Sequence, residues 1–365
     1  MLYSSSMVMV DRRTHSEIGA HMLQMQMAWC VLGAILCFVV AALDYEVLKK
    51  FAWSLFFATL FLAGLVFVPH IGINLNGAHR WIGKFGVTCQ PSEFVKISLI
   101  VLVAWYGDRC QRKMHTFKMG ILVPGIIIGG ALGLIFIEPD RGTTILMAAV
   151  CGTMLMIAGI RWMHVVPPVL LLLAGLAYSL THDAMRSRRI MAWLHPDAHA
   201  SGAALQAEQA KIAIGSGGLT GLGLGDGRQK LGFLPEIHSD FIFANIGEEL
   251  GFIAAILVVL AFFLIAVCGL YIALRSRDQF GCLLAVGVTA LISFQSLINI
   301  GVVTSLLPNK GIALPFISAG GSSLVAMLTG VGILLSVARQ ARSADVAVSD
   351  FVSKSNDNPF AAKAT

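Results

Sequence analysis

The sequence predicts an all-α, polytopic membrane protein. Of its 365 residues, 57% are hydrophobic and 13% are charged, whereas soluble domains average roughly 45–50% apolar and about 25% charged residues. The mean hydropathy is +0.79. The net charge of +6 comes from short loops between apolar runs, so it does not indicate nucleic-acid binding. Seven scattered cysteines without a CxxC pair provide no redox or zinc framework.

Apolar runs predict nine transmembrane helices and one multi-span domain over residues 1–342. A straight span needs about 20 residues, so the short run 94–106 should borrow flanking residues or lie where the bilayer is locally thin. The predicted spans are Met27–Leu43, Phe51–Pro69, Phe94–Tyr106, Met119–Ile137, Thr143–Ile160, Met163–Leu180, Ile246–Leu274, Gly281–Leu307 and Gly320–Ala338.

The basic residues predict the orientation. When the spans alternate, most loop lysines and arginines fall on one side, which the positive-inside rule assigns to the cytoplasm. These residues are Lys49, Lys50, Arg109, Arg112, Lys113, Lys118, Arg161, Arg275, Arg277, Arg339 and Arg342. The long loop 181–245 then faces outward. The tail 343–365 is polar, is predicted to be disordered, and lies in the cytoplasm.

The long outward loop 181–245 has the composition of a functional segment. Loops of this length are usually functional or disordered, and this one contains glycine turns, amphipathic stretches and paired charges. Its part KIAIGSGGLTGLGLG, residues 211–225, lacks the GxGxxG spacing of a dinucleotide site. We therefore expect a flexible, close-packed, re-entrant segment there.

The stretch LPEIHSDFIFANIGEELG places Asp240 directly before an apolar run, with His238 upstream and Glu248 and Glu249 downstream. A charged side chain at the centre of a membrane helix costs roughly 2.5–3.5 kcal/mol, so such residues normally line a cavity or pathway. The alternative is a helix N-terminus at the interface, where carboxylates suit the helix dipole. We expect a chemical role for Asp240 and supporting roles for the other three residues.

Two further polar groups lie near predicted span boundaries. In NGAHRWIG, Arg80 stands beside Trp81; the alternative to a binding role is an aromatic-belt tryptophan with a snorkelling arginine. In QPSEFVKIS, Glu93 and Lys96 are three residues apart, so on a helix they share a face and can pair. A neutralised structural pair is the alternative reading there.

The remaining polar residues occur in turns and broken helices. IEPDRGTT contains Glu138, Asp140 and Arg141, and a plain turn is the preferred reading for Arg141. A metal site at His195, Asp197 and His199 is the less favoured reading of that part of the loop. In LLPNKGIALPFISAGGSSL, prolines and glycines break the helix, so that Lys310, Ser318, Ser322 and Ser323 can face a cavity. These groups converge on the outer half of the membrane and indicate an anionic, lipid-borne substrate.

The motifs RWIG, QPSE, EPDxGTT, IGSGGLxGxGLG, LPExHxDFIFAxIGEELG and LPxKGxxLPFISxGGSSL occur in one order along the chain, with a further match at Arg189–Pro196. In these motifs the chain resembles the SEDS family (shape, elongation, division and sporulation), the FtsW, RodA and SpoVE proteins of bacteria. The resemblance extends from about residue 1 to Arg342. Gln229–Lys230, GEELG and Asn309–Gly311 are more similar to the division-type FtsW branch.

Four positions depart from the family pattern: Cys89, Arg141, His195 and Ala319 replace residues that are more usual there. None of them is needed for chemistry, although Arg141 adds positive charge to the outer face. The family has ten spans, and MLYSSS at the N-terminus is similar to the end of the first. The resemblance therefore implies a further span upstream of residue 1.

The resemblance implies a peptidoglycan glycosyltransferase that polymerises lipid II outside the bacterial cytoplasmic membrane, in septal synthesis. The implied partners are a class B penicillin-binding protein and other cell-division proteins. Asp240 matches the essential carboxylate and would act as general base in an inverting transfer. No covalently bound cofactor is implied, and a divalent cation, Mg²⁺ or Mn²⁺, could stabilise the leaving diphosphate. The expected substrate-binding residues are Arg80, Trp81, Glu93, Lys96, Lys310, Ser322 and Ser323.

Two alternatives stay open at this point. A lipid II flippase would use the intramembrane charges to guide a headgroup across the bilayer. A non-catalytic scaffold would recruit a penicillin-binding protein without needing the carboxylate of Asp240.

Overall fold

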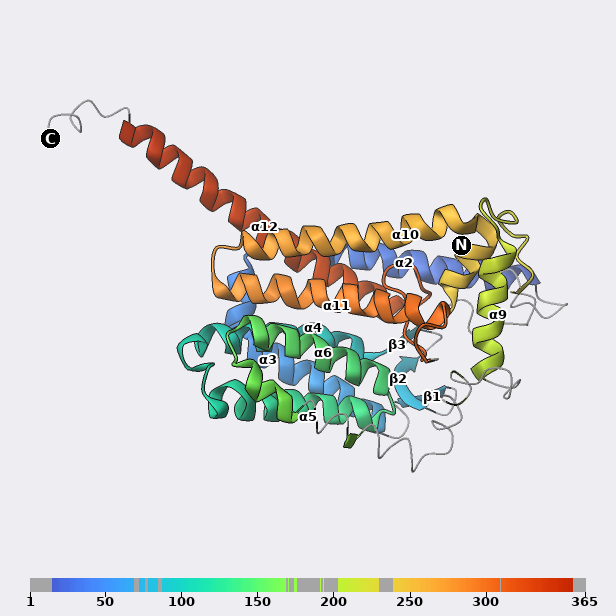
Figure 1. Cartoon of the computed structure of the whole chain (residues 1–365), viewed down its shortest axis with the longest axis horizontal. Coiled ribbons are helices and arrows are strands. Elements are labelled where there is room, and N and C mark those ends of the chain that lie inside the picture. The colour runs from blue at the N-terminus through green and yellow to red at the C-terminus, as the bar shows by residue number, and fades with distance from the viewer. Residues whose placement is uncertain are drawn as a thin grey trace, which may run out of the picture.

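The computed structural model describes residues 15–68, 72–75, 78–84, 87–168, 203–229, 239–308 and 310–356, with the isolated positions 170, 174–175, 191 and 193. Its main feature is a bundle of long, roughly parallel helices (Figure 1). The bundle helices are α2 (His15–Ala42), α3 (Tyr45–Gly64), α4 (Pro91–Arg109), α5 (Val123–Ile137), α6 (Arg141–Ile157), α10 (Ile242–Leu274), α11 (Gln279–Val303) and α12 (Gly321–Asn356).

The predicted polytopic helical fold is confirmed. Within the described ranges, six helices are long and apolar enough to cross a membrane, and Arg141–Ile157 is a shorter apolar helix. Eight of the nine predicted spans coincide with described helices. Half of the ninth, Met163–Leu180, lies outside the described residues, so the count of nine stays a prediction.

The short predicted span 94–106 does borrow flanking residues. Pro91 occupies the first turn of α4, where its missing N–H costs no helical hydrogen bond. The helix continues to Arg109, and its 19 residues extend over about 28 Å, nearly the thickness of the hydrocarbon layer.

The core of the bundle lies around α11, which packs against α4, α6, α10 and α12. α2 lies at the periphery and packs closely on α12. Glycines allow this approach, because a Cβ added at Gly33 would come within 2.7 Å of Leu328 and one at Gly332 within 2.6 Å of the Cys37 carbonyl oxygen. Small residues at such contacts are typical of membrane helix pairs.

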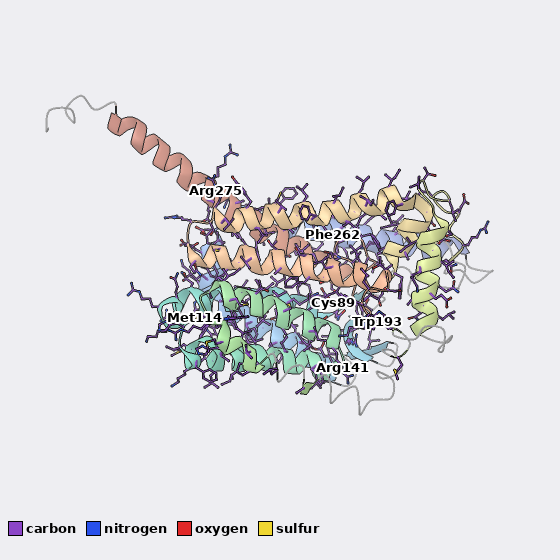
Figure 2. All side chains as sticks on the ribbon, viewed as in Figure 1. Cys89, Met114, Arg141, Trp193, Phe262 and Arg275 are labelled. Carbon is purple, nitrogen blue, oxygen red and sulfur yellow. The ribbon has the colours of Figure 1, made fainter. Side chains whose placement is uncertain are left out.

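The basic loops lie together at one end of the bundle, as alternating spans require. Tyr45 Oη donates to Asp278 Oδ1 at 2.6 Å, and Lys49 Nζ pairs with Asp108 Oδ2 at 2.6 Å. Figure 2 places Met114 and Arg275 at this end, and Cys89, Arg141 and Trp193 at the other. We call the latter end, which carries the sheet, residues 138–142 and residues 304–320, the polar end.

A small antiparallel sheet at the polar end was not predicted. Its strands β1 (Gly72–Leu75), β2 (Ala78–Lys84) and β3 (Val87–Cys89) pair in sequence order. The signal in the sequence is the Asn76–Gly77 pair between two short alternating segments, a strong local indication of a hairpin. Apolar composition elsewhere led to an all-helical prediction.

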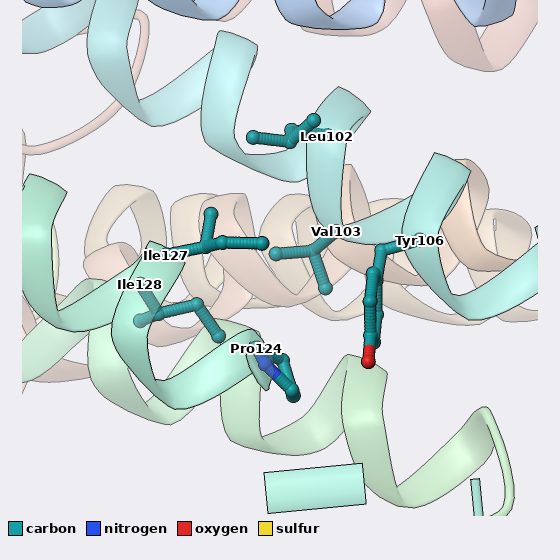
Figure 3. Close-up of a pocket in the computed structure, with 6 residues that line it drawn as sticks. All are labelled: Leu102, Val103, Tyr106, Pro124, Ile127 and Ile128. Carbon is teal, nitrogen blue, oxygen red and sulfur yellow. The ribbon is translucent and has the colours of Figure 1, made fainter. Parts of the chain in front are cut away.

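The connections contain short helices: η1 (Leu65–Phe67), η2 (Gln111–Lys113), the π-helix η3 (Lys118–Leu122) and α9 (Ala203–Ser216), which packs against α10. A small pocket between α4 and α5 has an apolar lining (Figure 3). Its lining residues are Leu102, Val103, Tyr106, Pro124, Ile127 and Ile128. The adjoining Tyr106 hydroxyl donates to the Met119 carbonyl at 2.6 Å, so the pocket offers no evident chemical group.

α12 continues as a helix to Asn356 and projects away from the bundle (Figure 1). The sequence predicts a disordered tail from residue 343. The described part of that tail contains neither glycine nor proline, the two residues least compatible with a helix interior. Residues 357–365 lie outside the described part of the chain.

Candidate active site

α10 is broken near its start by Gly251, whose φ of 80° and ψ of −177° are non-helical. A Cβ added at Gly251 would collide with the Gly221 nitrogen. Across the break, Leu222 N donates to the Glu248 carbonyl at 3.0 Å and Phe252 N donates to the Gly218 carbonyl at 2.9 Å. Residues 211–225, which we call the glycine-rich segment, therefore pack directly on the broken helix α10. This confirms the predicted close packing.

Glu248 and Glu249 are both buried, with 1% of their surface exposed. Glu248 Oε1 accepts hydrogen bonds from the backbone N–H groups of Arg228 at 2.7 Å and Gln229 at 3.2 Å. A Cβ added at Gly227 would lie 3.0 Å from Glu249 Oε1. The contacts of Glu248 therefore anchor the glycine-rich segment. His238, the third predicted supporting residue, lies outside the described residues.

Asp240 lies just before α10 and is partly buried, against residues 310–320, which we call the broken segment. A Cβ added at Gly311 would collide with the Asp240 carboxylate. Asn299 Nδ2 donates to the Asp240 carbonyl at 2.8 Å and to the Ile312 carbonyl at 2.7 Å. The start of α10 and residues 311–312 are thus held together by one side chain of α11.

Ser318 makes a second connection between the same two segments. Its hydroxyl donates to the Ser239 carbonyl at 2.5 Å and accepts from Leu314 N at 2.7 Å. The backbone on which Asp240 stands is therefore fixed from both sides.

Lys310 adjoins the turn that contains Asp140 and Arg141. Burial lowers the pKa of Lys310, the negative charge of Asp140 opposes this shift, and Arg141 adds to it. A Cβ added at Gly142 would lie 3.0 Å from Ile312 Cγ1, so this turn packs on the same broken segment. Arg141 also lies over the Phe136 ring, 5.3 Å from its centroid.

The turn at residues 138–142 is held by Arg80 of β2. The Arg80 guanidinium donates to the carbonyl oxygens of Glu138 at 2.9 Å and Pro139 at 2.6 Å. Asp140 caps α6, because its carboxylate accepts from Thr143 N at 3.1 Å and Thr143 Oγ1 at 2.9 Å. These described contacts of Arg80 are made with protein backbone.

Three predicted binding residues lie near this turn. Trp81 is partly buried in β2, where it pairs with Ile73 of β1. Ser322 is buried in the first turn of α12, and its hydroxyl accepts from Gln90 N at 3.2 Å. Ser323 beside it is partly exposed. Ser322 thus ties α12 to the start of α4.

Glu138 is fully buried, and neither oxygen of its carboxylate has a hydrogen-bond partner within the described structure. Its pKa is raised to about 8, mainly by burial and further by Asp140, while Arg80 opposes the shift. The fold therefore favours the protonated form of Glu138 at neutral pH.

Glu93 and Lys96 form the predicted ion pair, with Lys96 Nζ 2.7 Å from Glu93 Oε2. The pair is buried, and Lys96 is only 1% exposed. Lys96 Nζ also donates to Gln295 Oε1 at 3.2 Å, and Gln295 Nε2 donates to the Ala313 carbonyl at 2.9 Å. The pairing is confirmed, and it connects to the broken segment through α11.

Gln295 and Asn299 are the residues that the sequence analysis missed. They stand four apart in the apolar α11 and so share one helix face. Two buried amides at that spacing in a predicted span were a usable signal, because polar side chains within spans normally contact other polar groups.

Among the described residues, no group of three or more His, Cys, Asp or Glu side chains is placed to hold a metal ion. His195, Asp197 and His199 lie outside these residues. The described side chains therefore provide no protein-only metal cage.

Comparisons with known proteins relate the chain to one family. The family described as cell cycle protein, FtsW/RodA/SpoVE, matches residues 1–343. A probable peptidoglycan glycosyltransferase FtsW of Trichlorobacter lovleyi is 40% identical over 337 residues, which cover 92% of this chain and 88% of that protein. Stage V sporulation protein E of Bacillus subtilis is 38% identical over 342 residues, covering 94% and 93%.

Solved structures share the fold. A chain in the structure "Structural coordination of polymerization and crosslinking by a peptidoglycan synthase complex" has a TM-score of 0.75 at 24% identity, covering 88% of this chain and 90% of that chain. The rod shape determining protein RodA of Thermus thermophilus has a TM-score of 0.65 at 24% identity, covering 93% and 94%.

Proposed function

This chain belongs to the FtsW/RodA/SpoVE family of cell cycle proteins, and we propose that it polymerises lipid II into glycan strands at the outer face of the bacterial cytoplasmic membrane. Family membership supports a peptidoglycan glycosyltransferase. Similarity to FtsW proteins favours septal synthesis during cell division.

The partial exposure of Asp240 is the main observation that supports this proposal. Five other acidic side chains of the site are buried: Glu93, Glu138, Asp140, Glu248 and Glu249. Asp240 is partly exposed at the edge of the broken segment, so its carboxylate can meet a substrate. A base must lie within hydrogen-bond reach of the proton that it removes.

The reaction needs one such base. The acceptor sugar hydroxyl attacks the anomeric carbon of the donor, and its proton passes to the Asp240 carboxylate. The bond from that carbon to the diphosphate oxygen breaks, and the polyprenyl diphosphate leaves with the electron pair. Since the donor is α-linked and the product β-linked, a single displacement inverts the anomeric centre. A good leaving group removes the need for the second carboxylate that inverting hydrolases use.

Positive charge beside Asp240 suits this leaving group. The Asp240 carboxylate packs against Gly311, and Lys310 is the residue directly before Gly311. A preorganised cation at this place would stabilise developing negative charge. Lys310 is therefore the preferred contact for the diphosphate. Arg80, Trp81, Ser322 and Ser323 stay proposed as binding or shaping residues.

A divalent cation, Mg²⁺ or Mn²⁺, remains part of the proposal as a partner of the substrate. Mg²⁺ commonly binds through substrate phosphates and one or two carboxylates, so it needs no larger protein cage. Chelation followed by re-addition of either metal tests this requirement.

The orientation and partners follow from the same proposal. The basic end of the bundle faces the cytoplasm under the positive-inside rule, so the C-terminus is cytoplasmic and the polar end faces outward. A class B penicillin-binding protein would crosslink the strands. A chain in a peptidoglycan synthase complex with the same fold supports such a partner, and other division proteins would join it.

Purified protein with lipid II in detergent tests the function, because detergent micelles have no membrane sides. Glycan strands are expected, whereas flipping alone would leave lipid II unpolymerised. Asp240→Asn should slow polymerisation on the order of 10²- to 10⁴-fold, the usual contribution of acid–base catalysis. If Asp240→Asn polymerises at the wild-type rate, the base is another group. If Asp240→Asn supports growth and partner binding in cells, the scaffold reading is favoured.

A further inference from the structure

α11 carries two amide side chains, Gln295 and Asn299, one turn apart and almost fully buried, at 2% and 1% exposure. Burying an amide costs about 1–3 kcal/mol in proteins unless hydrogen bonds compensate. An apolar side chain at either position of this membrane helix would avoid that cost. The partners of the two amides indicate why polar groups stand at these positions.

Both amides donate to carbonyl oxygens of the same extended segment. Gln295 Nε2 bonds Ala313 O at 2.9 Å, and Asn299 Nδ2 bonds Ile312 O at 2.7 Å. Asn299 Nδ2 additionally bonds Asp240 O at 2.8 Å. One helix face therefore sets the position of the Gly311–Ala313 backbone, and Asn299 places the Asp240 backbone against it.

The buried ion pair joins this arrangement through Gln295. Lys96 is paired with Glu93 and donates to the oxygen of the Gln295 amide at 3.2 Å. This hydrogen bond fixes the amide orientation, so that its nitrogen faces Ala313 O. An ammonium that is 1% exposed is poorly placed to contact a substrate.

We propose that Gln295 and Asn299 are positioning residues that hold Asp240 against Gly311, and that the Glu93–Lys96 pair acts on the reaction through Gln295 rather than by binding lipid II. The inference rests on the proposed function, since it concerns the same reaction. It gives Glu93 and Lys96 a role in aligning the base, in place of the substrate contact expected from the sequence. Misplacement of a reacting group by about 1 Å can cost on the order of 10²-fold in rate.

The test measures kcat and KM for lipid II with the full chain, purified in detergent together with its class B penicillin-binding protein. Asn299→Leu and Gln295→Leu should each lower kcat by about 10- to 100-fold, while KM stays within about twofold. The paired change Glu93→Gln with Lys96→Met, which leaves no buried charge unpaired, should have the same signature. Ser296→Ala is the matched control, because its hydroxyl bonds Ser293 O of the same helix.

A double-variant cycle separates positioning from a general structural defect. If Asn299 acts by placing Asp240, Asn299→Leu should cause no further loss of kcat in an Asp240→Asn background, because that residual rate does not use the base. If the two losses multiply, the amide supports the fold generally and the inference is wrong. Asn299→Ala, which removes the donor without adding bulk, replaces Asn299→Leu should the latter not fold.

The outcomes also distinguish the inference from the proposed function. Wild-type protein that forms no glycan strands overturns the function. Wild-type protein that polymerises, with Asp240→Asn slow and Asn299→Leu at the wild-type kcat, overturns the inference alone. A raised KM in the Glu93→Gln/Lys96→Met variant with unchanged kcat would assign the pair to substrate binding.

Discussion

Replacement of Glu138 by Gln should change how the stability of this protein depends on pH. The folded protein raises the pKa of Glu138 from 4.5 to about 8, because the buried carboxyl is difficult to ionise. Between these values the folded state binds a proton that the unfolded state has released. The free energy of unfolding therefore falls as pH rises through this window, by at most about 1.4 kcal/mol per pH unit.

The size of the effect follows from the burial. Glu138 is fully buried and its carboxylate oxygens have no hydrogen-bond partner within the described structure, so ionisation meets little compensation. The Gln variant keeps the size of the side chain and cannot ionise. Relative to it, the wild-type protein should lose up to about 2 kcal/mol between pH 6 and pH 8, which corresponds to a melting-temperature difference of a few degrees.

The assay is thermal unfolding in detergent at several pH values from about 5.5 to 8.5, with wild type, Glu138→Gln and a control. Glu46→Gln is a suitable control, because Glu46 is exposed at the opposite end of the bundle. The melting temperatures of wild type and Glu138→Gln should diverge only as the pH rises. Parallel pH dependence in these two proteins would show that Glu138 is ionised or hydrated in the fold, contrary to the reasoning.

Two further predictions concern the packing around Asp240 and the glycine-rich segment. Gly311→Ala should reduce polymerisation on the order of 10²-fold, since the new methyl group displaces the Asp240 carboxylate. Gly125→Ala is the matched control, because a Cβ added there meets nothing within 4 Å. Equal activity of the two variants would refute the contact between Gly311 and Asp240. Glu248→Ala should destabilise the protein by about 1–3 kcal/mol, because the part-buried backbone N–H groups of Arg228 and Gln229 lose their acceptor. Proteolysis near residue 228 is the readout, and an unchanged cleavage rate would argue against the anchor.

Much of the fold was predictable because it depends on local composition. The apolar runs located eight helices, and the basic loops predicted their alternation. The Glu93–Lys96 pair was predictable as well, because a three-residue spacing on one helix fixes the neighbours without any tertiary information. The sheet at residues 72–89 was missed, since its strands are short and only the Asn76–Gly77 pair marks them.

The surroundings of Asp240 could not be predicted in the same way. Its backbone partner Asn299 is 59 residues away, and Ser318, which holds the neighbouring Ser239, is 79 residues away. No periodicity connects residues at such separations. The sequence motif therefore identifies the carboxylate, while the tertiary contacts determine whether it is buried or accessible.

The same distinction explains why the acidic residues of one site should differ in role. Glu93 is neutralised by Lys96, Asp140 by the first turn of α6, and Glu248 by two backbone N–H groups. Each of these contacts engages the carboxylate with the protein itself and holds the side chain in place, away from an incoming hydroxyl. Glu138 is fully buried, and its raised pKa favours the protonated form, so it is poorly suited to take a proton from an incoming hydroxyl. Asp240 combines partial exposure with a backbone fixed by Asn299, and this combination supports its proposed role as the base.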